Sequence, residues 1–83
     1  MNNPKQIFTQ EGYDKIIEEI EERETTIRSK IADEIEKARQ QGDLSENAAY
    51  KAAIESKEFN ENRINQLKEL LVNAEIASSQ NLG

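Results

Sequence analysis

The feature that most constrains this chain is a helical spacing of apolar residues that Gly42 divides into two long stretches. Pro4 is the only proline, and Gly42 is the only glycine between residues 13 and 82. On both sides of Gly42 the apolar residues recur at steps near three and four, which is the spacing of one helix face. Two such patterns joined by a short turn predict two helices that pack as antiparallel neighbours.

The first pattern begins near Thr9, which we expect to cap the helix, and continues to about residue 40. Its apolar positions are Tyr13, Ile16, Ile17, Ile20, Ile27, Ile31, Ile35 and Ala38. Glu24 interrupts this stripe, and the steps of four from Ile27 to Ile35 predict a local unwinding of the supercoil. Stabilising pairs four residues apart are expected at Glu19–Arg23, Glu24–Arg28 and Asp33–Lys37.

The second pattern consists of Ala48, Ala49, Ala52, Ala53, Phe59, Ile64, Leu67, Leu70, Leu71 and Ala74. Its alanines lie next to the turn, where small side chains allow two helices to approach closely. Residues 1–8 predict an irregular leader, and residues 77–83 predict a linker or tail. We therefore expect an all-α fold, with a long antiparallel coiled-coil hairpin over residues 9–76 and its tip at residues 42–46.

The composition excludes several classes of function. The 83 residues include no Cys and no His, which excludes disulfides, zinc sites of the Cys/His type, thiol nucleophiles and imidazole bases. A net charge of -6 predicts no strong autonomous binding to nucleic acid. No apolar run approaches the length of a membrane span, so we expect no membrane contact and a cytoplasmic location. With no nucleophile beside a base and no phosphate-binding loop, we expect neither a free-standing enzyme nor a cofactor of its own.

The turn contains the residues most suited to chemistry. Gly42 is expected to end the first helix in a left-handed conformation, and Asp43 to begin the second, with Glu46 at capping-box spacing. One interpretation is that these two carboxylates only cap a helix. The other is that they bind a hard cation such as Mg²⁺, which takes oxygen ligands. Two carboxylates alone bind metal weakly, so another macromolecule would have to complete the site.

The residues beside the turn also have two interpretations each. Asn47 either fills the first helical turn or orients a water or phosphate with its amide, and Tyr50 either packs or takes part in the tip. Lys37, Arg39 and Lys51 either belong to a solvated helix surface or form a small basic spot that touches nucleic acid held by a partner.

The segment from Ala38 to Ala53 (ARQQGDLSENAAYKAA) closely resembles the tip signature of the bacterial transcript cleavage factors GreA and GreB. The segments Thr9–Tyr13 and Phe59–Ile64 resemble the first and second helices of the same family. The likeness covers nearly the whole chain. Its Gly-Asp-Leu-Ser-Glu-Asn run with a following tyrosine is a far more specific signal than a capping box.

This resemblance implies a coiled-coil hairpin that enters the secondary channel of bacterial RNA polymerase. Asp43 and Glu46 would be catalytic in trans, because they would help to hold a Mg²⁺ ion at the polymerase's own active centre. The result would be cleavage of the 3′ end of a backtracked transcript, with the polymerase and the nascent RNA 3′ end as partners. The supporting tip residues would be Leu44, Ser45, Asn47 and Tyr50.

Two departures from the family pattern affect this interpretation. The family continues into a globular FKBP-like domain, whereas this chain stops at Gly83, so we expect a fragment that docks weakly. Ile54 stands where family members often have a basic residue, which together with the acidic total favours a GreA-like over a GreB-like factor.

Two alternatives remain. One is a Gre-related inhibitor that binds the same channel. The presence of both tip acids argues against this inhibitor. The other is a purely structural coiled-coil module. Evidence against this alternative is the poor surface for self-association formed by Glu24, Ser56 and the alanine run.

Overall fold

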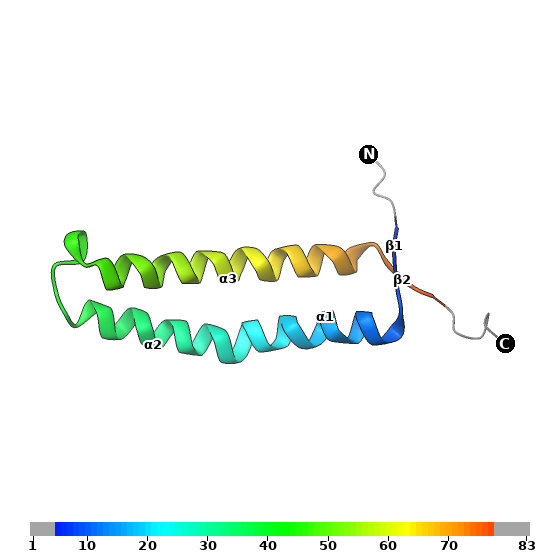
Figure 1. The fold of residues 1–83 in the computed structure, drawn as a ribbon, viewed down its shortest axis with the longest axis horizontal. Coiled ribbons are helices and arrows are strands. Elements are labelled where there is room, and N and C mark those ends of the chain that lie inside the picture. The colour runs from blue at the N-terminus through cyan, green and yellow to red at the C-terminus, as the bar shows by residue number, and fades with distance from the viewer. Residues whose placement is uncertain (1–4, 78–83) are drawn as a thin grey trace.

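Two long helical arms run side by side and join at one end, as Figure 1 shows for the computed structural model, which describes residues 5–77. The first arm is formed by α1 (Gln10–Glu22), a π-helical turn, η1 (Arg23–Ile27), and α2 (Arg28–Arg39). The second arm is the single helix α3 (Ala48–Val72). The molecule extends over 62 × 29 × 13 Å. The predicted helical hairpin is therefore confirmed.

A short parallel strand pair closes the open end of the hairpin. Strand β1 (Gln6–Phe8) pairs with β2 (Ala74–Ile76), with Ile7 opposite Glu75. Residues 6–8 were expected to be irregular and residues 74–76 to belong to the coiled coil, and both expectations are wrong. The hairpin brings residues 6–8 and 74–76 together, and their backbone groups then hydrogen-bond to each other rather than to water. Residues 1–4 of the predicted leader and 78–83 of the predicted tail lie outside the described residues.

The core is a narrow seam between the arms. Its buried apolar side chains are Ile20, Ile31, Ala38, Ala53, Ile64 and Leu67, all of which belong to the predicted stripes. Two large stripe residues are instead exposed, Ile17 at 41% and Phe59 at 67%, as are the stripe alanines Ala48, Ala49 and Ala52. In α3 the position next to Phe59, Asn60, faces the seam and is only 2% exposed. The helix geometry thus places the polar side chain of Asn60 in the seam and leaves the aromatic side chain of Phe59 outside it.

A polar contact between the arms explains why an asparagine occupies this core position. The side-chain amide of Asn60 donates to the backbone carbonyl of Arg23 at 3.0 Å, and its carbonyl accepts from the Arg23 guanidinium at 3.0 Å. Arg23 opens the π-helical turn, in which the N–H of Arg28 also donates to the Arg23 carbonyl. The first arm therefore departs from regular α-helical geometry at Arg23–Ile27.

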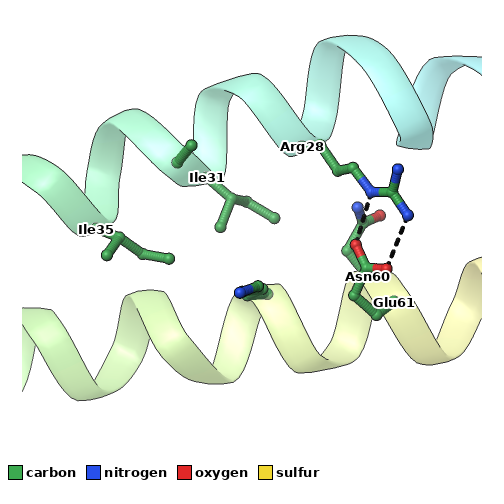
Figure 2. Close-up of a pocket in the computed structure, with 7 residues that line it drawn as sticks. Arg28, Ile31, Ile35, Asn60 and Glu61 are labelled. Carbon is green, nitrogen blue, oxygen red and sulfur yellow. Dashed lines mark hydrogen bonds and ion pairs between the residues drawn. The ribbon is translucent and has the colours of Figure 1, made fainter.

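Ion pairs across the seam replace pairs expected within the first arm. Arg28 was expected to pair with Glu24, but it makes two hydrogen bonds of 2.8 Å to Glu61 of α3, shown in Figure 2. The Glu24 carboxylate instead lies 2.7 Å from the Lys68 ammonium group. The expected Asp33–Lys37 pair is not among the ion pairs of the described residues, whereas Glu19–Arg23 is confirmed at 2.8 Å. Within residues 5–77, no helix is both long enough and apolar enough to cross a membrane.

Replacement of Asn60 by Ala should lower the free energy of unfolding by about 2 kcal/mol, because the Arg23 carbonyl and the half-buried Arg23 guanidinium each lose a hydrogen bond. Urea unfolding followed by circular dichroism measures this loss. Asn62→Ala, on an exposed part of the same helix, is the matched control and should change stability by less than about 0.5 kcal/mol. Equal effects of the two substitutions would contradict a structural role for the Asn60–Arg23 contact.

The stability of the hairpin should also depend on Glu19. A hydrogen bond from Arg23 lowers the pKa of its carboxyl below the ordinary value of 4.5, and Arg63 acts in the same direction. Because the folded pKa is depressed, the stabilisation is complete above the pKa of the unfolded chain and is lost as pH falls through the folded pKa. The free energy of unfolding should therefore fall more steeply from about pH 5 to about pH 3 in the wild type than in Glu19→Gln.

The matched control for this titration is Glu18→Gln, an exposed neighbour on α1. Its stability should follow the wild-type curve closely over the same range of pH. If Glu19→Gln also follows that curve, the Glu19–Arg23–Arg63 contacts do not contribute to folding.

Candidate functional site

The tip of the hairpin begins where α2 ends. The N–H of Gln41 donates to the carbonyl of Ala38 at 3.0 Å, and the N–H of Gly42 to that of Arg39 at 3.0 Å. Gly42 then has a φ of 82°, in the left-handed region, as its position after the helix predicted. A residue with a side chain is strained in this conformation, so glycine is the residue suited to this turn.

Asp43 does not cap the second helix, and this prediction is wrong. Asp43 is itself left-handed, with a φ of 39°, and its side chain makes no cap hydrogen bond. It precedes the single 3₁₀ turn η2 (Leu44–Glu46). The N-cap of α3 is Asn47, whose φ of -87° and ψ of 100° are the extended values that an N-cap residue takes. The capping-box spacing therefore identified the right segment but the wrong capping residue.

Asn47 joins the two arms at the tip. Its side-chain oxygen accepts from the N–H of Tyr50 at 2.9 Å and so caps α3. Its side-chain nitrogen donates to the carbonyl of Ala38 at 2.6 Å and to that of Gly42 at 3.2 Å. One amide group thus contacts the last turn of α2, the glycine turn and the first turn of α3.

The two tip acids are exposed beyond this junction. Asp43 and Glu46 both line a shallow, open depression of about 470 Å³. Ser45 donates its hydroxyl to the Asp43 carboxylate at 2.9 Å. Within residues 5–77 no group of three or more potential metal-ligating acids is present. Two exposed carboxylates do not make a complete metal site, although carboxylate oxygens are the type of ligand that Mg²⁺ takes.

The remaining tip residues differ in burial. Leu44 is 41% exposed and Ser45 is exposed, so both lie on the outer surface of the turn. Tyr50 is half-buried at the start of α3, where its N–H is held by Asn47. The backbone N–H of Tyr50, rather than its side chain, therefore makes the hydrogen bond that connects this residue to the tip.

Three basic residues flank the tip acids on the two arms. Lys37 and Arg39 end α2, Lys51 lies in the first turns of α3, and all three are exposed. The Arg39 guanidinium lies 3.9 Å from the Glu36 carboxylate, and within residues 5–77 no ion pair joins Arg39 to Asp43. All three basic side chains are thus on the surface near the tip, where a partner could reach them.

Comparison with known proteins places this chain in a family. The family model described as "Transcription elongation factor, N-terminal" matches residues 6–76. Among similar proteins is the transcription elongation factor GreA of Magnetococcus marinus, which is 48% identical over 80 residues, or 96% of this chain and 51% of the relative. GreA of Amoebophilus asiaticus is 40% identical over 75 residues, or 90% of this chain and 48% of the relative. GreA of Brucella canis is 45% identical over 69 residues, or 83% of this chain and 44% of the relative.

The chain spans about half the length of these relatives. The matched residues include both arms, the tip and both strands. A helical hairpin with an acidic tip, matched over nearly its whole length, is therefore the N-terminal part of a known factor type: the chain belongs to the GreA/GreB family of transcription elongation factors.

Proposed function

We propose that this hairpin inserts into the secondary channel of bacterial RNA polymerase and stimulates cleavage of the 3′ end of a backtracked transcript. The polymerase performs the hydrolysis, and the hairpin contributes side chains in trans. The partners are then the polymerase and the RNA 3′ end inside it, and the location is the cytoplasm.

One observation carries this proposal: two exposed carboxylates occupy the far end of a long, narrow rod. Asp43 and Glu46 lie in the turn between α2 and α3, at the opposite end of the arms from the strand pair (Figure 1). The smallest extent of the molecule is 13 Å and the largest is 62 Å. Such a rod can carry charge into a channel too narrow for a globular domain. Membership of a family of transcription elongation factors supports RNA polymerase as the protein that contains this channel.

The side chains of the tip would have separate tasks. Asp43 and Glu46 supply carboxylate oxygens toward a Mg²⁺ ion that the polymerase also binds. When bound there, this ion activates a water and stabilises charge on the phosphodiester. Lys37, Arg39 and Lys51 flank the acids and provide positive charge toward the RNA backbone.

Replacement of Asp43 or Glu46 by Ala should each reduce stimulated cleavage by at least roughly 10-fold, because loss of even an outer partner of a metal ligand costs about 10- to 100-fold. The measurement is the rate of RNA shortening in purified backtracked complexes. The chain is added over a range of concentrations, alone and joined to the C-terminal half of the Magnetococcus marinus relative. Helical content should stay unchanged, because neither side chain caps a helix.

Asp33→Ala and Glu55→Ala, at exposed positions away from the tip, are the matched controls and should cleave as the wild type does. Normal cleavage by both tip variants would refute a role for these acids in cleavage. Slowed elongation without cleavage would instead identify an inhibitor of the polymerase channel. No effect on the polymerase together with stable self-association would identify a structural module.

A further inference from the structure

The turn that carries the two acids has little structure of its own. Asp43, Leu44, Ser45 and Glu46 are all exposed. The backbone bonds of η2 are long, at 3.2 Å from the Glu46 N–H to the Asp43 carbonyl and 3.4 Å from the Asn47 N–H to the Leu44 carbonyl. The bond from Ser45 to Asp43 stays within the turn. The orientation of the acids relative to the rod must therefore be set at the two ends of the turn.

The side chain of Asn47 makes hydrogen bonds at both ends of this turn. The Asn47 amide nitrogen donates to Gly42, the residue before Asp43, and to Ala38 in the last turn of α2. Asn47 is itself the residue after Glu46, and its oxygen fixes α3 through the N–H of Tyr50. The four-residue segment between Gly42 and Asn47 is thereby closed into a loop by the 3.2 Å bond. Ala38 is buried at 3% exposure, so this contact also ties the loop to the core.

Helix capping alone does not explain why this residue is asparagine. Serine and aspartate cap helices about as well as asparagine, because each offers an oxygen to the first free N–H groups. Only an amide combines such an acceptor with two donor hydrogens on the same planar group. Here the acceptor caps α3 and the nitrogen reaches two carbonyls of the other arm. All three hydrogen bonds together require an amide side chain.

We propose that Asn47 is the positioning residue of the tip, which holds Asp43 and Glu46 in the one orientation that lets them share a metal ion with the polymerase. This inference rests on the proposed function. Metal ligands must be held within about 0.5 Å of the productive geometry by residues that are themselves fixed. The Asn47 side chain hydrogen-bonds to neither carboxylate in the described residues and acts through the backbone of the turn.

The substitution Asn47→Ser separates positioning from capping. Serine keeps the N-cap oxygen and adds no charge, but it has no amide to bridge Ala38 and Gly42. Helical content should therefore remain that of the wild type. The first measurement uses the chain alone: NMR order parameters of the backbone amides at residues 43–46 should drop from about 0.85 to below about 0.6. Asn62→Ser, the same change at an exposed site on α3, is the matched control and should leave the tip ordered.

The second measurement is cleavage in backtracked complexes as a function of Mg²⁺ concentration. Asn47→Ser should need roughly 10-fold more Mg²⁺ for half-maximal cleavage, while its concentration for half-saturation of the polymerase stays that of the wild type. Asn47→Ala should show the same requirement for Mg²⁺ and also lose helix at the start of α3.

The outcomes separate the two proposals. An ordered tip in Asn47→Ser overturns the role of Asn47 in ordering the turn, and a mobile tip with the wild-type Mg²⁺ requirement overturns its role in positioning the acids. Normal cleavage by Asp43→Ala and Glu46→Ala overturns the proposed function and the role of Asn47 toward the metal ion. In that event the NMR measurement still decides whether Asn47 orders the turn.

Discussion

Two helices that pack only against each other share a single narrow face, and this constraint governs the whole hairpin. Six apolar side chains are buried along that face, and no third layer covers them in the described part of the chain. Non-directional apolar contact on so small a surface specifies helix register weakly. Directional contacts then become important, and the buried Asn60 with its two hydrogen bonds to Arg23 supplies one. A polar side chain at one seam position is an established way to fix register between paired helices.

Register matters because the tip acids lie at the opposite end of the arms from the strand pair. A shift of one helical turn moves side chains by about 5.4 Å along an arm. The turn between Arg39 and Ala48 would have to absorb such a shift, and the Asn47 bridge from α3 to Ala38 would break. The Asn60–Arg23 contact midway along the arms and the Asn47 bridge at the tip therefore both oppose such a shift. Together they connect the position of Asp43 and Glu46 to the packing of the seam.

Local signals in the sequence predicted much of this architecture. Thr9 caps α1 through a 2.9 Å bond from the N–H of Gly12, and Gly42 takes the left-handed conformation expected after a helix. The error at Asp43 has a local cause, because Asp43 and Asn47 are both good capping residues and the sequence does not show which one has extended backbone. The strand pair was missed for a different reason: its three-residue partners are far apart in sequence and meet only once the hairpin has formed.

The seam and the tip contain contacts that patterns of residue type do not predict. Apolar spacing favoured Phe59 for the core, but the π-helical turn at Arg23 presents a carbonyl and a guanidinium that only a polar side chain can satisfy. No spacing rule predicts a π turn, so the partner of Arg23 could not be predicted either. At the tip, the acids were identified from the sequence, whereas the three bonds of Asn47 depend on the distance between the arms. The two acids of the tip could thus be predicted from the sequence, whereas the hydrogen bonds of Asn47 required the folded chain.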